Sequence, residues 1–80
     1  MTEAEIYEGL TEIFADVFLR DDIILSPALT AKDVAGWDSF KQIEIIISTE
    51  ERFGMKFSTK EIDSLRCVGD LVAVVAAKTK

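Results

Sequence analysis

The sequence predicts an all-α fold with three main helices, a short third helix, and a long loop after the first helix. Two observations lead to this fold class. Apolar residues recur at helical spacing in three separate segments. Between these segments, acidic, serine, proline and glycine residues interrupt the periodicity. With 80 residues the chain is long enough for one small domain, so residues 1–80 are expected to form a single unit.

The first helix is expected from about Thr2 to Leu19. Thr2 and Glu5 have the form of a capping box, and early acidic residues suit the positive end of a helix. Gly9 weakens this prediction slightly, because glycine disfavours helices. The apolar face expected to meet the core consists of Ile6, Leu10, Ile13, Phe14 and Val17.

The connection over about residues 20–37 is unusually long for a compact domain, and such loops are often functional. Asp21-Asp22, Ser26-Pro27 and Gly36 break any helical pattern within it. The side chains expected to hold the loop against the core are apolar: Ile23, Leu25, Leu29 and Val34.

The second helix is expected from about Ser39 to Phe53, with Gly54 as its C-terminal stop. Its apolar residues span roughly 220° of the helical wheel, about twice the width that a surface helix needs. One stripe contains Ile45, Ile46 and Phe53, with Thr49 between them. The adjoining stripe contains Phe40, Ile43 and Ile47, and is flanked by Glu44, Glu50 and Glu51. One stripe should face the core, and the other should face a bound apolar group, a partner, or both.

Residues 55–58 are expected to form an extended link, after which Ser58 or Thr59 caps a brief helix with Ile62 and Leu65 facing inward. The segment over about residues 68–77 is rich in valine, which also suits a buried strand. We favour a helix because no second strand is available to pair with it. Its apolar residues have helical spacing: Val68, Leu71, Val72 and Val75. The polar tail Lys78-Thr79-Lys80 follows.

The composition excludes several classes of function. The net charge of −6 leaves no basic face for nucleic acid, and suits partners with basic patches or simply keeps the protein in solution. The chain has one cysteine, Cys67, expected to be partly buried, and no histidine, so disulfides and zinc or haem sites are not expected. No apolar stretch is long enough to span a membrane. The acidic N-terminus lacks the features of a signal peptide, so we expect a cytoplasmic protein.

Ser39 lies where a polar, turn-prone loop becomes a strongly apolar helix. The free N–H groups and the dipole at a helix N-terminus favour a phosphate group there. Without histidine, paired catalytic carboxylates or a Gly-rich phosphate loop, the chain offers no catalytic residue and no metal site, and we do not expect an enzyme. A serine that carries a phosphate-linked group fits better than a nucleophile, although a serine here is also an ordinary helix cap.

Three blocks of sequence resemble acyl carrier proteins. Gly36-Trp37-Asp38-Ser39-Phe40, preceded by Asp33-Val34, resembles the attachment motif of that family, which is usually Asp-Ser-Leu. Residues 50–57 resemble its run of acids followed by Phe-Gly and alternating apolar residues, and Cys67-Val68-Gly69-Asp70-Leu71 resembles the start of its last helix. The blocks have the order and spacing of the family, and the resemblance covers nearly the whole chain.

This resemblance implies a four-helix bundle that catalyses no reaction. Ser39 would receive 4′-phosphopantetheine from coenzyme A through a phosphopantetheinyl transferase that uses Mg²⁺. The terminal thiol of that arm would hold an acyl group as a thioester, and the carrier would present it to acyl-loading and acyl-processing enzymes with basic docking patches. We expect it to act as a monomer.

Roles for individual residues follow from the same resemblance. Asp38 would cap the second helix or help the transferase orient its metal. Phe40, Ile43 and Ile47 would contact partners or line an opening for an acyl chain. Glu44, Glu50 and Glu51 would meet basic residues on partners. Trp37 is expected to be a packing residue for the loop, and Asp70 only a charge in the first turn of the last helix.

Some positions depart from the pattern of the family. Phe40 replaces a leucine, Lys41 stands where many fatty-acid carriers have an acid, and Cys67 replaces a capping threonine or serine, so the last helix should start less firmly. These departures suit a dedicated carrier for a specialised acyl, aminoacyl, peptidyl or polyketide-type unit as well as a fatty-acid carrier. The alternative is a carrier-like helical interaction subunit that is never modified.

Overall fold

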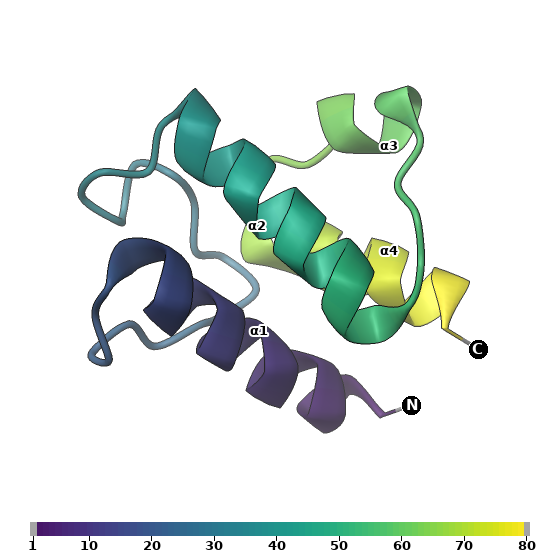
Figure 1. Cartoon of the computed structure of the whole chain (residues 1–80), viewed down its shortest axis with the longest axis horizontal. Coiled ribbons are helices and arrows are strands. Elements are labelled where there is room, and N and C mark those ends of the chain that lie inside the picture. The colour runs from purple at the N-terminus through teal and green to yellow at the C-terminus, as the bar shows by residue number, and fades with distance from the viewer. Residues whose placement is uncertain (1, 80) are drawn as a thin grey trace.

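The computed structural model describes residues 2–79 and contains four helices (Figure 1). They are α1 (Glu3–Phe18), α2 (Ser39–Phe53), α3 (Thr59–Asp63) and α4 (Val68–Lys78). The all-α prediction, the short third helix and the long loop after α1 are confirmed, and the valine-rich last segment is a helix. Met1, and Lys80 at the end of the predicted polar tail, lie outside the described residues.

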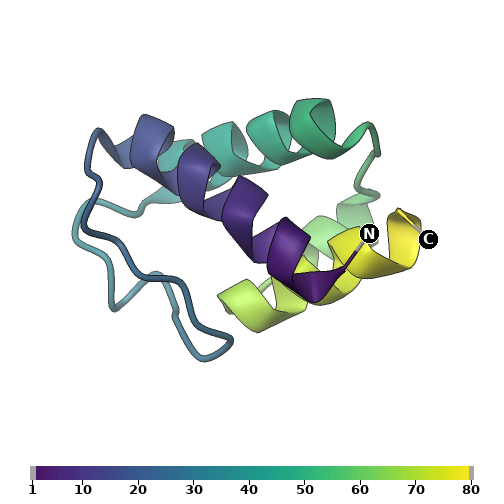
Figure 2. The same ribbon diagram turned by 90° about the horizontal axis from the view of Figure 1, so that it is seen from below.

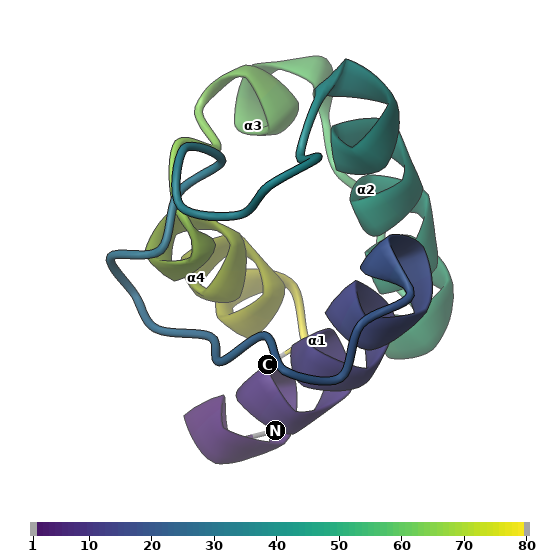
Figure 3. The same ribbon diagram turned by 90° about the vertical axis from the view of Figure 1, so that its left-hand side faces the viewer.

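Helices α1 and α2 run in opposite directions, so the end of α1 lies beside the start of α2 (Figures 1 and 2). Helix α1 also packs against α4, and α3 lies on the side of the bundle opposite α1 (Figure 3). Each apolar residue predicted for the inner faces of α1 and α4 is buried in the core. The core cluster consists of Ile6, Leu10, Ile13, Phe14, Val17, Ile45, Val68, Leu71, Val72 and Val75.

The antiparallel pair of α1 and α2 is held together along its length. A Cβ atom on Gly9 would lie 2.7 Å from Cζ of Phe53, so the glycine that weakens α1 locally allows the two helices to approach. Near this contact, Arg52 forms an ion pair with Glu12. At the other end, Nζ of Lys41 donates to the carbonyl oxygen of Val17 at 3.1 Å. Because α1 has no basic residue in its last turn, this ammonium group supplies the positive charge that a helix C-terminus favours.

The loop between α1 and α2 is packed on the core, as predicted. Val34 is buried, and Ile23, Leu25 and Leu29 pack against the core cluster. The loop also completes the start of α4. The N–H of Val68 donates to the carbonyl oxygen of Leu29 at 2.9 Å, and the N–H of Gly69 donates to that of Pro27 at 3.0 Å.

Cys67 is the N-cap residue of α4, and its side chain makes no capping hydrogen bond, as expected for a cysteine at this position. The two loop carbonyls take over that function, because they accept from N–H groups that a helix leaves free. Asp70 was predicted to be only a charge in the first turn of α4, but it also holds the backbone just before that helix. Its carboxylate accepts a hydrogen bond from the N–H of Arg66 at 3.1 Å, and this bond is the main reason that the pKa of Asp70 is lowered.

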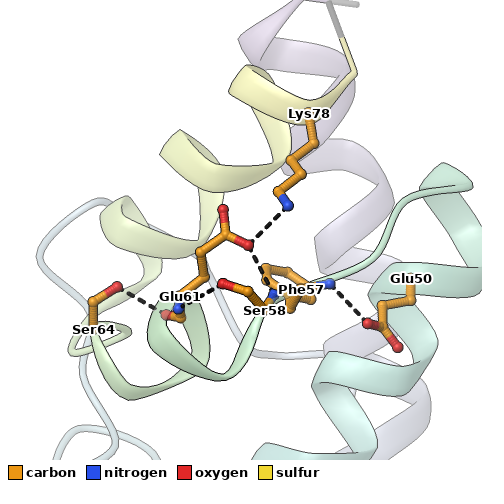
Figure 4. A network of polar contacts seen from close by, with 6 residues as sticks. All are labelled: Glu50, Phe57, Ser58, Glu61, Ser64 and Lys78. Carbon is orange, nitrogen blue, oxygen red and sulfur yellow. Dashed lines mark hydrogen bonds and ion pairs between the residues drawn. The ribbon is translucent and has the colours of Figure 1, made fainter.

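Helix α3 is held by a polar network that reaches α2 and α4 (Figure 4). Ser58, rather than Thr59, is its N-cap and forms a capping box with Glu61. Lys78 is not part of a free tail: it is the last residue of α4, and its Nζ lies 2.8 Å from Oε1 of Glu61. Ile62 and Leu65 are only half-buried, so the short helix depends on these polar contacts as well as on apolar packing.

Candidate functional site

Helix α2 begins at a capped and well-defined N-terminus. Asp38 is the N-cap residue, and its Oδ1 accepts a hydrogen bond from the N–H of Lys41 at 3.0 Å. The carbonyl oxygen of Asp38 accepts from the N–H of Gln42 at 2.9 Å. The capping role predicted for Asp38 is therefore confirmed, and the interpretation of Ser39 as the cap is wrong. The other predicted role of Asp38, orienting the metal of a transferase, stays a prediction.

Ser39 is the first residue of α2, and its side chain is exposed. Within residues 2–79, no hydrogen bond uses its hydroxyl group or the backbone N–H groups of Ser39 and Phe40. The first turn of α2 contains no acidic residue. A phosphate on this hydroxyl group would therefore meet two free N–H donors and the positive end of the helix dipole.

Trp37 fixes the loop immediately before Ser39. Its ring meets the rings of Phe14 and Phe18 edge-on, at centroid distances of 5.3 Å and 6.0 Å. Its Nε1 donates to Oε1 of Gln42 at 2.8 Å. Before it, Gly36 has a φ of +86°, which glycine adopts at little cost in a turn. The packing role predicted for Trp37 is confirmed, and its contacts hold the loop before Ser39 against α1 and against Gln42 of α2.

Two spaces adjoin this N-terminus. An open hollow with a volume of about 460 Å³ lies beside the hydroxyl group and is lined by Ala31, Trp37, Asp38, Ser39, Gln42 and Ile43. A much smaller inner cavity, of about 30 Å³, shares Ala31, Trp37 and Gln42 with that hollow. The inner space holds about one water molecule. Trp37 and Gln42, which are joined by a hydrogen bond, therefore line both spaces, and only the outer hollow has room for a flexible arm.

The two apolar stripes of α2 behave as predicted. Ile45, Ile46 and Thr49 are buried, and Phe53 is half-buried and packs against the core cluster. In contrast, the side chains of the second stripe are exposed to water: Phe40 by 77%, Ile43 by 54% and Ile47 by 50%. Exposed apolar side chains that lie together on one helix face indicate an interaction surface. This surface begins one residue after Ser39.

The acidic residues near this surface differ from one another. Glu44 and Glu51 are exposed. Glu50 is half-buried, and its Oε2 accepts a hydrogen bond from the N–H of Phe57 at 2.8 Å, which ties the link after α2 to that helix.

Lys41 has a structural role that the sequence prediction missed, because its ammonium group bonds to the end of α1. The signal for it was the lack of any basic residue in the last turn of α1.

Neither a metal centre nor a membrane segment is found in the described part of the chain. No group of three histidine, cysteine, aspartate or glutamate side chains in residues 2–79 is arranged to hold a metal ion. None of the helices in the same range combines the length and apolar character needed to cross a membrane.

Comparisons with known proteins agree with this geometry. A family model described as a phosphopantetheine attachment site matches residues 8–75. The chain is 34% identical over 74 residues to the meromycolate extension acyl carrier protein of Mycolicibacterium smegmatis. The match covers 92% of this chain and 75% of that relative. It is 30% identical over 79 residues to an acyl carrier protein of Acidothermus cellulolyticus, covering 99% and 94%.

The fold is also that of a solved carrier. The solution structure of a holo acyl carrier protein from Geobacter metallireducens matches with a TM-score of 0.86 and 37% sequence identity, over 91% of this chain and 84% of the other. The four helices, the exposed serine at the start of α2 and the match over residues 8–75 lead to one conclusion. This chain belongs to the acyl carrier protein family, whose members bear phosphopantetheine and are carriers rather than catalysts.

Proposed function

We propose that Ser39 is the attachment point of 4′-phosphopantetheine in this chain, and that the protein presents acyl groups to partner enzymes of fatty-acid or specialised acyl biosynthesis. One observation carries the proposal. The Ser39 hydroxyl group is exposed at the first residue of α2, and Asp38, not Ser39, caps this helix. The hydroxyl group is thus free to form a phosphodiester without loss of a bond that holds the fold.

The residues around Ser39 suit this group. The N–H groups of Ser39 and Phe40 face the same helix end and favour the charge of a phosphodiester. The outer hollow beside Gln42 and Ile43 offers space for the part of an arm nearest the protein. When bound, the arm supplies a terminal thiol on which acyl groups are carried as thioesters. Its length and flexibility keep that thiol at a high effective concentration for each enzyme that docks.

The proposed docking surface is the exposed stripe of α2 with its acidic border. Its apolar residues would pack against a partner, and its carboxylates would meet basic residues on the transferase and on acyl-processing enzymes. Within this surface, Glu50 takes part through Oε1, because Oε2 is already bonded to the link after α2. The proposed surface contains Asp38, Phe40, Ile43, Glu44, Ile47, Glu50 and Glu51.

For the pathway we propose only a broad class of acyl biosynthesis. The name of the Mycolicibacterium smegmatis relative refers to meromycolate extension, and that of the Acidothermus cellulolyticus relative to acyl carriage in general. In this chain, a lysine, Lys41, stands where many fatty-acid carriers have an acid, and its bond to the Val17 carbonyl oxygen turns it toward α1. We propose a monomeric cytoplasmic carrier that serves fatty-acid synthesis or a related specialised acyl pathway.

Intact-mass measurement tests the attachment. The protein is incubated with coenzyme A, Mg²⁺ and a broad-specificity phosphopantetheinyl transferase. The wild-type chain should gain the mass of one phosphopantetheine, and Ser39→Ala should gain none. Ser48→Ala removes another hydroxyl group from α2 and should still gain one. If the wild-type chain stays bare while a known carrier is modified in the same mixture, the unmodified interaction subunit becomes the better explanation.

A further inference from the structure

The seam between α1 and α2 contains a groove that borders the docking surface at Glu44 and Ile47 and extends it onto α1. It has a volume of about 300 Å³ and lies where the last turns of α1 meet the middle of α2. Ile47 lies eight residues after Ser39, which corresponds to about 12 Å along the helix axis. The groove is lined by Asp16, Val17, Glu44, Ile47 and Ser48.

The groove is lined by apolar and acidic side chains. Ile47 is 50% exposed and lies beside Val17, which is nearly covered. Asp16 comes from α1 and Glu44 from α2, so the groove has a carboxylate from each helix. Helix α1 contains no lysine or arginine. The groove therefore combines a small apolar surface with negative charge on two sides.

The charges that could neutralise the groove are mostly used elsewhere. Asp16 forms no ion pair with any residue from 2 to 79. Glu44 has only a long contact with Nζ of Lys41, at 3.7 Å, and that ammonium group also donates to the Val17 carbonyl oxygen. Asp16 also lies in the last turn of α1, where the helix dipole makes a negative charge unfavourable. Its position is thus costly for the fold and favourable for a cation.

A basic side chain with a long alkyl stem matches this groove. Its stem would cover Ile47 and Val17, and its charged head would lie between Asp16 and Glu44. An arginine suits this arrangement better than a lysine, because its planar fork can bond to two carboxylates at once. The volume lies at the lower end of the range for small-molecule sites, so a single side chain from a protein partner is the better occupant.

We propose that this groove receives an arginine anchor from the transferase that loads Ser39, so that α1 as well as α2 forms the docking surface. The inference rests on the proposed function, because an enzyme that modifies Ser39 must bind around the start of α2. A stable protein interface buries about 800 Å² on each partner. Such an enzyme must therefore extend well beyond Ser39, and the groove is within its reach.

The test compares the loading rates of two variants that each remove one negative charge from α1. Asp16→Asn removes the charge from the groove. Glu8→Gln is the matched control, because Glu8 lies on the same helix but lines a separate hollow near Arg52 and Phe53. At low salt, Asp16→Asn should lower kcat/KM for phosphopantetheine transfer about threefold to tenfold, while Glu8→Gln should change it less than about twofold. Because Asp16→Asn also removes an unfavourable charge from a helix C-terminus, unfolding should not cause the loss.

Ser48→Arg provides a second, independent variant. It places an arginine on the lining of the groove from within the chain, so it should block the groove and slow loading at least as much as Asp16→Asn. Equal slowing by Asp16→Asn and Glu8→Gln, or normal loading of Ser48→Arg, would overturn the proposal that the groove binds the transferase. Complete final modification of the same variants would still support the carrier function. A wild-type chain that never gains mass would instead overturn the proposed function, and the groove inference with it.

Discussion

The backbone N–H of Gly69 donates a hydrogen bond to the carbonyl oxygen of Pro27 at 3.0 Å, and this contact joins the long loop to the start of α4. A Cβ atom on Gly69 would lie 3.0 Å from the same oxygen. The loop that leads to Ser39 is thus anchored at a point where a side chain on residue 69 would press against the backbone of Pro27. The nearest atom is a backbone oxygen, so a larger residue at position 69 would require the loop backbone itself to shift.

Gly69→Ala should therefore destabilise the protein by about 1 kcal/mol, because the clash outweighs the gain in helix propensity. Thermal unfolding followed by circular dichroism measures this change. Helix propensity alone predicts the opposite sign, a gain of about 0.5–1 kcal/mol. Ala73→Gly, at an exposed position of α4, calibrates that propensity effect. A Gly69→Ala variant that is more stable than wild type would contradict the close approach.

Glu50→Ala should lower stability by about 1 kcal/mol, because it removes the acceptor that holds the N–H of Phe57. For a domain of this size the loss corresponds to a Tm lower by about 4–8 °C. Glu51→Ala is the neighbouring control, since Glu51 is exposed, and it should leave Tm nearly unchanged. Equal melting temperatures for both variants would show that Glu50 does not support the link after α2.

Leu19→Gly should stabilise the protein by about 0.5–1 kcal/mol. Leu19 ends α1 with a φ of 54°, a conformation that is unfavourable for residues with a Cβ atom, and its side chain is 88% exposed. Leu19→Ala keeps the Cβ atom and should bring little gain. Chemical denaturation compares the two, and a glycine variant no more stable than the alanine variant would argue against a strained helix end.

The contact between Glu61 and Lys78 should make stability depend on pH. The side-chain bond from Lys78, and then the bond from the N–H of Ser58, hold the pKa of Glu61 below its ordinary value of 4.5. Because the folded pKa is lowered, this carboxylate stabilises the fold above the ordinary value, and the contribution is lost as pH falls through the lowered pKa. Glu61→Gln should therefore melt at a lower temperature than wild type at about pH 7, and the difference should shrink in acid. A difference that stays constant across this range would contradict the contact.

Periodic patterns in the sequence predict the elements of this fold well, because each helix has a local apolar face. The buried faces of α1 and α4 and the division of α2 into a buried and an exposed stripe follow directly from such spacing. The choice of a helix for the last segment is also confirmed. It depended on the absence of a pairing strand rather than on the preferences of its valines.

The contacts between segments could not be predicted in the same way. The approach of Gly9 to Phe53, the bond from Lys41 to Val17 and the pairing of Lys78 with Glu61 each join residues far apart in the chain. No local pattern fixes which helices lie side by side. At the site, the sequence indicates Ser39 but not which residue caps α2, because Asp38 and Ser39 are both good caps.

Mass analysis of the protein isolated from its own cells tests the central claim most directly. After proteolysis, the peptide that contains Ser39 should carry the mass of phosphopantetheine, with or without an acyl group, and the other serine-containing peptides should be unmodified. Native protein that is always bare at Ser39, or that carries the group on another residue, would contradict the assignment of this hydroxyl group as the point of attachment.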